Sequence, residues 1–203
     1  MWDNATIPYT IHKNLQQDII ERIENAIEHY HKHTFFRLQK RQGESHYLRF
    51  KPSKKDKNYT SDGCGGYDSK AVTIWLTEGA SFSTIVHEIG HAIGLDHEQQ
   101  RSDRDKYVEV IEENISPGMK GNFKIPKRSI TFGEYDYRSF MHYGAYTKAK
   151  PWHYQWRKKP NILRTVIIDS EWFVFALNSS TGSVEIRKMK YSGNKWIIGR
   201  GSL

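Results

Sequence analysis

The stretch from His87 to Glu98, HEIGHAIGLDHE, constrains this chain more than any other part of it. On an α-helix, residues four positions apart lie one turn apart on the same face, so His87 and His91 can reach a single ion. His97 would lie on the wrong side of a continuous helix. Gly94 can adopt the left-handed conformation that ends a helix and turns the chain back. The stretch therefore predicts a helix, a sharp turn and a returning third histidine.

Three imidazoles can form the donor set of a catalytic zinc site, and a carboxylate lies next to them. Imidazole nitrogens bind zinc at about 2.0–2.1 Å, and catalytic sites keep one position open for water. Glu88 can contact a zinc-bound water without being a ligand itself. A bare HExxH also occurs in helices whose histidines only hydrogen-bond to neighbours, but the added glycine and third histidine are much rarer. The sequence thus predicts one Zn²⁺ ion, held by His87, His91 and His97.

A second motif lies downstream, at residues 135–144, and reads YDYRSFMHYG. A zinc motif of this spacing followed by a turn that contains methionine is the signature of the metzincin peptidases. Taken alone, Met141 would be ordinary core filler and Tyr143 a packed aromatic side chain. Next to the zinc motif, both are predicted to belong to the site.

Length and charge narrow the class of protein. With 203 residues, the chain can form one domain with a substantial core, or one domain plus an appendage. Lysine and arginine exceed aspartate and glutamate by 31 to 23, and we interpret most of this excess as a solvated surface. Attraction of acidic substrates is the weaker alternative. No nucleic-acid module is recognisable, no apolar run reaches the roughly 18 residues of a membrane span, and the N-terminus lacks a signal-peptide pattern.

Cys64 is the only cysteine, so no disulfide can form within the chain. Its surroundings, Gly-Cys-Gly-Gly, favour a small residue in a turn over a reactive thiol. Four Asn-x-Ser/Thr sequons begin at Asn4, Asn58, Asn114 and Asn178, and they matter only where the source glycosylates secreted proteins.

Hydrophobic periodicity indicates an α+β domain with a mixed, twisted sheet. Apolar residues from Ile19 to Tyr30 follow a helical period, which predicts a long amphipathic N-terminal helix packed on a sheet. Alternating residues predict strands at 35–38, 47–50 and 72–76. Ser81 or Ser83 can cap the helix that carries the zinc motif.

The end of the chain has a different character. From about Lys148 it consists of short strand-like runs separated by turn sequences, which predicts a β-rich C-terminal tail. We therefore expect a catalytic domain over residues 1–147 and a diverged β-rich segment over residues 148–203. A cluster of His29, His31 and His33 in the first helix is interpreted as a solvated helix end, with a second metal site as the less favoured alternative.

Residues 87–108 and 135–144 together resemble the astacin family of zinc metalloendopeptidases, and weaker similarity extends over roughly residues 2–147. The resemblance implies a metzincin-like catalytic domain that hydrolyses internal bonds of polypeptides, and a secreted protein. It implies that Glu88 is the general base and that Tyr143 is an extra zinc ligand, which can leave the metal and stabilise the tetrahedral intermediate. Met141 would form an apolar floor beneath the histidines, and Glu98 would pair with the mature N-terminus. The resemblance further implies that a substrate-edge strand comprises Val72, Thr73, Ile74 and Trp75.

The chain also departs from the family pattern. The family usually has two disulfides, whereas Ala80 stands where a partner for Cys64 would be expected. The family's pro-segment and C-terminal helix are not recognisable, and the tail is loosely similar to one blade of a β-propeller lectin. These departures leave a second hypothesis open: a catalytically weak or inactive zinc-folded binding module, with carbohydrate binding by the tail. We expect a monomer, no nucleic-acid partner and no membrane span.

Overall fold

A computed structural model of the chain describes residues 2–60, 71–127, 130–144 and 155–158, and beyond them the backbone of four strands between residues 161 and 198. The chain divides into two compact units. The first comprises Met1–Ser102 with Lys124–Gly144, and the second comprises Asp103–Phe123 with Ala145–Leu203. The turn predicted around Cys64 lies outside the described residues.

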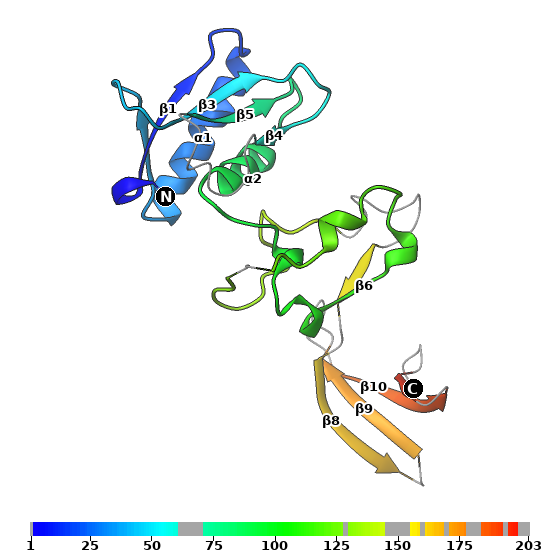
Figure 1. The fold of residues 1–203 in the computed structure, drawn as a ribbon. Helices are drawn as coiled ribbons and strands as arrows, with labels where there is room; N and C mark the ends of the chain where they lie inside the picture. The colour runs from blue at the N-terminus through cyan, green and yellow to red at the C-terminus, as the bar shows by residue number, and fades with distance from the viewer. Residues whose placement is uncertain are drawn as a thin grey trace. The chain divides into compact units, whose positions relative to one another are not determined.

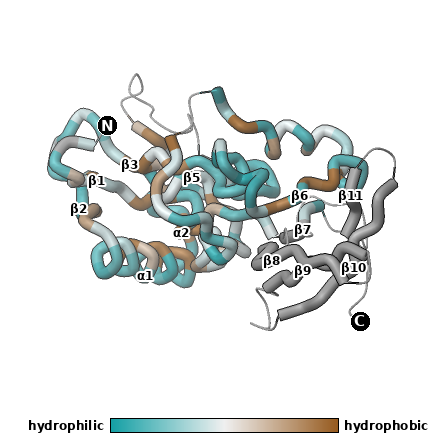
Figure 2. Tube along the Cα trace, turned by 90° about the horizontal axis from the view of Figure 1, so that it is seen from below, coloured by the Kyte–Doolittle hydropathy of each residue, from teal (hydrophilic) through white to brown (hydrophobic). Residues whose placement is uncertain are grey.

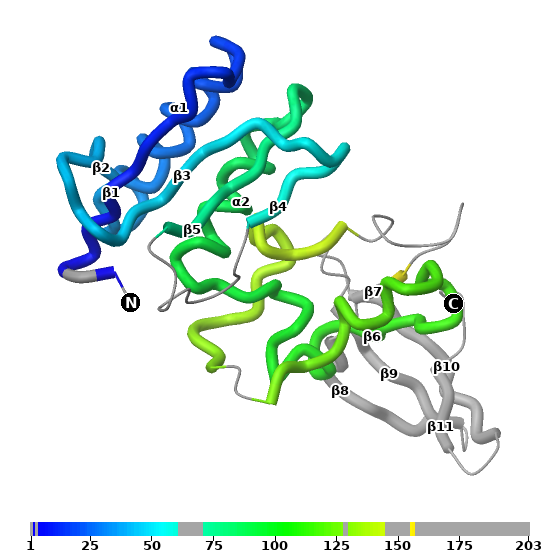
Figure 3. Tube along the Cα trace, turned by 45° about the horizontal axis from the view of Figure 1, so that its top comes forward, coloured from blue at the N-terminus to red at the C-terminus, as the bar shows by residue number. Residues whose placement is uncertain are grey.

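A five-stranded mixed sheet forms the centre of the first unit. Its strands are β1 (Thr6–Ile11), β2 (Arg37–Lys40), β3 (Tyr47–Pro52), β4 (Tyr59–Thr60) and β5 (Ala71–Leu76). Their order is β2-β1-β3-β5-β4, and every pairing is parallel except that of β4 with β5 (Figure 3). Leu48 and Phe50 are buried while the residues between and beside them are half-exposed, as expected for a sheet with one covered face.

Two helices, α1 (Gln17–His33) and α2 (Phe82–Ala92), lie on the same side of this sheet (Figure 1). Apolar and polar residues alternate around α1 with a helical period (Figure 2). The buried positions of α1 are Ile19, Ile23, Ala26, Ile27 and Tyr30. The Tyr30 hydroxyl donates a hydrogen bond of 2.9 Å to the carbonyl of Val86, and burial raises the pKa of this phenol. The helix that carries the zinc motif is thereby fixed to the one before it.

The sheet order corrects the prediction of the substrate-edge strand. β5 lies between β3 and β4, and Ile74 and Trp75 pair with Thr60 and Tyr59. Placing these two residues at the edge was therefore wrong, and the described pairing of β4 with β5 ends at Ile74, before it reaches Thr73 and Val72. Alternation reveals that a strand exists but not its neighbours. The outermost described strand on this side, β4, is too short to show any pattern.

Strand β2 begins at Arg37 and not at Phe35, whose side chain is 73% exposed. In the second unit, β6 (Val108–Val110) pairs antiparallel with β7 (Trp156–Lys158). A four-stranded antiparallel sheet follows in the order β11-β10-β9-β8. Its strands are β8 (Asn161–Ile168), β9 (Glu171–Leu177), β10 (Val184–Ser192) and β11 (Lys195–Ile198). None of the described helices is both long and apolar enough to cross a bilayer.

Candidate zinc active site

Helix α2 positions the first two histidines. Ser81, one of the two predicted caps, is the N-cap, and its side chain accepts a hydrogen bond of 3.2 Å from the backbone of Thr84. Ile85 and Ile89 are fully buried against the core. The apolar face of α2 thus anchors the helix, while His87 and His91 remain partly exposed one turn apart.

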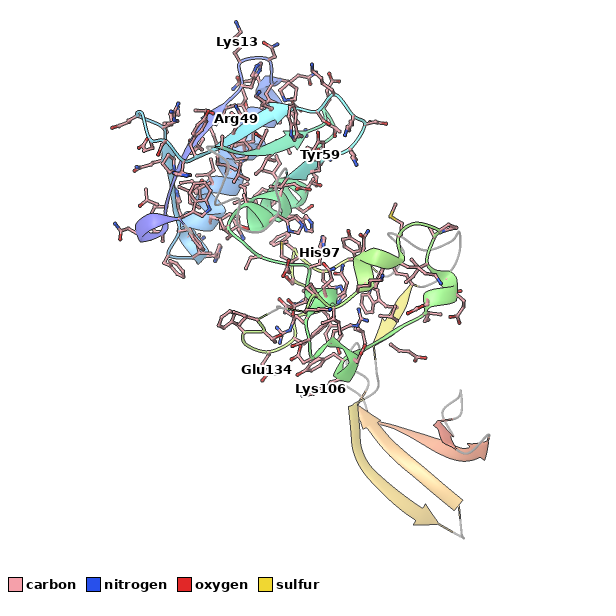
Figure 4. The ribbon with its side chains drawn as sticks, viewed as in Figure 1. Lys13, Arg49, Tyr59, His97, Lys106 and Glu134 are labelled. Atoms are coloured by element: carbon pink, nitrogen blue, oxygen red, sulfur yellow. The ribbon has the colours of Figure 1, made fainter. Side chains whose placement is uncertain are left out.

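The turn after α2 brings the third histidine back. Gly94 has φ +103°, in the region that favours glycine. Its amide bonds to the carbonyl of His91 at 3.0 Å, and the amide of Leu95 bonds to that of Gly90 at 2.9 Å. These two bonds form the Schellman motif of a helix C-terminus. The predicted turn is present, and His97 follows it (Figure 4).

Each of the three imidazoles is held by an oxygen acceptor at its Nδ1 atom. The pairs are His87 with Phe140 O at 2.7 Å, His91 with Leu95 O at 2.8 Å, and His97 with Gln100 Oε1 at 2.9 Å. Because these oxygens can only accept, each Nδ1 carries the proton and each Nε2 keeps its lone pair. This arrangement fixes both the tautomer and the orientation that a metal site requires.

The geometry of the Nε2 atoms fits a tetrahedral metal ion. The Nε2 atoms of His91 and His97 lie 3.2 Å apart, although neither has a proton to share. Zinc–nitrogen bonds of 2.0–2.1 Å at a tetrahedral angle separate two ligand atoms by about 3.3–3.4 Å. One potential ligand atom from each of the three histidines lies within 4.8 Å of the others. Burial lowers the pKa of the His91 imidazole and lowers that of His97 to about 4. Both side chains are therefore neutral at neutral pH, which is the form that binds a metal.

Glu88 lies beside these ligands with its side chain buried. The hydroxyl of Thr60, on β4, is 2.7 Å from Glu88 Oε2 and 2.9 Å from the Glu88 carbonyl. The role of Thr60 could not be predicted, because nothing in the sequence indicates that a two-residue strand passes over α2.

Met141 and Tyr143 lie close to the histidines. A methyl group added at Gly90 would lie 2.5 Å from the sulfur of Met141, so the glycine allows this methionine to approach α2 closely. The rings of Tyr143 and His97 pack edge to face with centroids 4.5 Å apart. Burial raises the pKa of Tyr143, and the negative charge of Glu88 raises it further by a smaller amount. This phenol therefore keeps its proton at neutral pH.

Glu98 is bound by groups that sequence analysis did not identify. Its Oε1 atom accepts hydrogen bonds from Arg101 at 3.2 Å and from the amide of Asp136 at 2.9 Å. Arg101 is buried and also donates to the carbonyls of Phe132, Gly133 and Glu134. The expected contact of Glu98 with the N-terminus involves Met1, which lies outside the described residues.

The histidines of α1 form no comparable cluster. Among the described residues, His87, His91 and His97 are the one group of three metal-binding side chains. The rings of His29 and His33 lie 4.5 Å apart between centroids, with their planes tilted by 45°, but the ring of His31 accepts a hydrogen bond from the backbone of Leu38. His31 is therefore an anchor of β2 and not the solvated side chain that was expected.

Comparison with known families agrees with this geometry. The family model of the astacin peptidases matches residues 1–161. The chain belongs to the astacin family. Zinc is the cofactor of astacin proteases, and the three histidines bring together donor atoms that could hold one such ion.

Individual astacins show how far the likeness extends. Blastula protease 10 of Paracentrotus lividus is 37% identical over 163 aligned residues, and the match covers 71% of this chain and 25% of that protein. Astacin-like metalloprotease toxin 5 of Loxosceles gaucho is 34% identical, over 74% of this chain and 80% of the toxin. The solved structure of high choriolytic enzyme 1, a hatching enzyme zinc-protease from Oryzias latipes, has a TM-score of 0.69 at 29% identity. That alignment covers 79% of this chain and 80% of the other.

Some relatives are much longer than this astacin. The chain spans 25% of Blastula protease 10 and 21% of bone morphogenetic protein 1 from Xenopus laevis. At 15% identity and a TM-score of 0.53, the structure of myroilysin shares the fold alone.

Proposed function

We propose that this astacin is a zinc endopeptidase that hydrolyses internal peptide bonds of polypeptide substrates, with Glu88 as its general base. One observation carries the proposal: three histidines, each with its Nδ1 bonded to an oxygen, direct their Nε2 atoms toward one point beside a buried glutamate. A structural zinc site has four protein ligands and no bound water, so it does not require a buried carboxylate beside the metal.

Each residue of the site is proposed to have its own role in the reaction. Zinc, when bound, supplies a Lewis acid that polarises the scissile carbonyl and lowers the pKa of water to about 7. Glu88 takes a proton from the attacking water and delivers it to the departing amine nitrogen. Tyr143 donates a hydrogen bond to the oxyanion that develops on the carbonyl, which requires the phenol to be protonated. Met141 supports the helix that carries two of the ligands.

The substrate is proposed to bind as an extended strand. A peptide that adds to a sheet edge is aligned by backbone hydrogen bonds. β4, at the end of the sheet order, is the strand to which such a peptide would add (Figure 3). The role first given to residues 72–75 is therefore assigned to the neighbouring strand.

We also propose that the catalytic domain includes β7, because β7 pairs with β6. We further propose that the protein acts outside the cell, as its family does.

Removal of zinc is the first test. Treatment of the full chain with a zinc chelator should abolish casein cleavage, and a stoichiometric amount of zinc should restore it, because the attacking water depends on the metal. Metal analysis and a fluorogenic peptide assay would follow both steps. A chain that binds zinc and cleaves nothing in a peptide library would instead support the inactive binding module.

Replacing Tyr143 with phenylalanine should lower kcat by about 10²-fold, the usual cost of losing one oxyanion donor. KM and zinc content should change little, because the ring and its packing on His97 remain. Steady-state kinetics with metal analysis would measure both. The control Tyr47→Phe removes a phenol from a half-exposed position of β3 and should leave the kinetics unaltered. Equal rates for the Tyr143 variant and the parent would exclude the assigned role.

A further inference from the structure

We propose that Thr60 is a positioning residue that orients the carboxylate of Glu88 for proton transfer. This inference rests on the proposed peptidase function. The hydroxyl lies 2.7 Å from Glu88 Oε2, a short distance typical of a hydrogen bond to an ionised carboxylate. Glu88 is buried, so the bond is shielded from competing water.

The strand around Thr60 is built to hold this contact. Thr60 pairs with Ile74 across β4 and β5, and Ile74 is fully buried on the helix side of the sheet, so the Thr60 side chain faces α2. Asn58 fixes the start of the strand: its Oδ1 atom accepts from the amide of Thr77 at 2.7 Å and from the Thr77 hydroxyl at 3.2 Å. Asn58 and Thr60 also form a glycosylation sequon, but both residues are half-buried and their side chains make hydrogen bonds within the chain.

The contact gives the two carboxylate oxygens different tasks. Oε2 is held by Thr60, whereas Oε1 accepts no hydrogen bond from the described residues. Oε1 is therefore the oxygen that receives the proton of the attacking water and later passes it to the departing amine. A carboxylate held at one oxygen presents the other in a fixed direction, which reduces the reorientation needed before transfer.

Thr60 also has a second acceptor for its single hydroxyl proton. The carbonyl of Glu88 lies 2.9 Å from Oγ1. While Glu88 is ionised, the hydroxyl favours Oε2, because a charged acceptor makes the stronger bond. Once Oε1 has taken up a proton and the charge is neutralised, rotation of the hydroxyl toward the carbonyl keeps its hydrogen bond. The residue thus supports both protonation states of the base without leaving a buried donor unpaired.

The position of Thr60 further links the base to the substrate. β4 is the strand to which an extended peptide would add. The backbone that aligns the peptide and the side chain that holds Glu88 therefore belong to the same two-residue strand.

Three variants test the role. Thr60→Val keeps the branched shape and removes the hydroxyl, and it should lower kcat about 10- to 100-fold with KM within about twofold and zinc content unchanged. Thr60→Ser restores the hydroxyl and should recover most of the rate. Thr10→Val, a control on β1 of the same sheet, should have no effect. A Thr60→Val enzyme as fast as the Thr10→Val enzyme would overturn the proposal.

Two further measurements separate this role from a general loss of structure or of function. In a Glu88→Gln background, Thr60→Val should cause no additional loss of rate, because residues that act as one unit are not additive. An additional tenfold loss would show that Thr60 acts independently of the base. If the parent cleaved no peptide, the proposed function would fail on its own. The carboxyl ¹³C resonance of Glu88 in the zinc-loaded chain would still report the contact: it should shift in Thr60→Val and not in Thr10→Val, and an unchanged resonance would refute the contact.

Discussion

Replacing Glu88 with glutamine should lower kcat/KM for peptide hydrolysis by about 10²- to 10⁴-fold, the range expected for loss of a general base. Glutamine has nearly the same shape and can still accept the Thr60 hydrogen bond through its amide oxygen, but it cannot take up a proton at neutral pH. The three ligands keep their Nδ1 partners, so zinc content should equal that of the parent.

A fluorogenic peptide assay combined with metal analysis would measure this effect, and thermal unfolding would confirm that the variant is folded. Glu28→Gln provides a matched control, because Glu28 is exposed on α1, and it should retain the parental rate. Parental cleavage by a zinc-loaded Glu88→Gln enzyme would rule out Glu88 as the base and require another group to take the proton.

Replacing Arg101 with methionine should lower the free energy of unfolding by about 3–5 kcal/mol, as when one partner of a buried ion pair is removed. The guanidinium is the shared donor for the carbonyls of Phe132, Gly133 and Glu134. It also pairs with Glu98, and the two side chains are only 10% and 15% exposed. Methionine fills a similar volume but leaves these acceptors without a partner and the carboxylate without its countercharge.

Urea unfolding of the zinc-saturated full chain would test this prediction. Arg101→Lys should restore only part of the free energy of unfolding that Arg101→Met loses, because a single ammonium cannot match the forked geometry of guanidinium. Arg37→Met, at an exposed position of β2, should cost no more than about 1 kcal/mol. A similarly small effect of Arg101→Met would mean that the segment carrying Glu134 and Asp136 is held by other contacts.

The parts of the site that sequence reasoning predicted correctly are local in the chain. The spacing of His87 and His91 and the backbone freedom of Gly94 are properties of one helix and the turn that follows it. The structure contains this helix and this turn, with φ +103° at Gly94. Helical geometry alone determines such contacts, because they join residues only a few positions apart. The α+β class and the mixed sheet follow similarly from periodicity and element order.

The contacts that tune the site depend on which distant segments meet, and only the tertiary structure decided them. Thr60 meets Glu88 across 28 positions of sequence, and Phe140 meets His87 across 53. Strand β4, and not β5 as predicted, lies at the edge of the described sheet. Alternation indicates which face of a strand is buried, but it does not indicate which strand lies beside it. The sequence by itself therefore determined the helix and the turn that bring the three histidines together. Packing decided how the ligands and the base are held, because hydrogen-bond partners distant in sequence become neighbours only when the sheet, the helices and the Met141 turn close on one another.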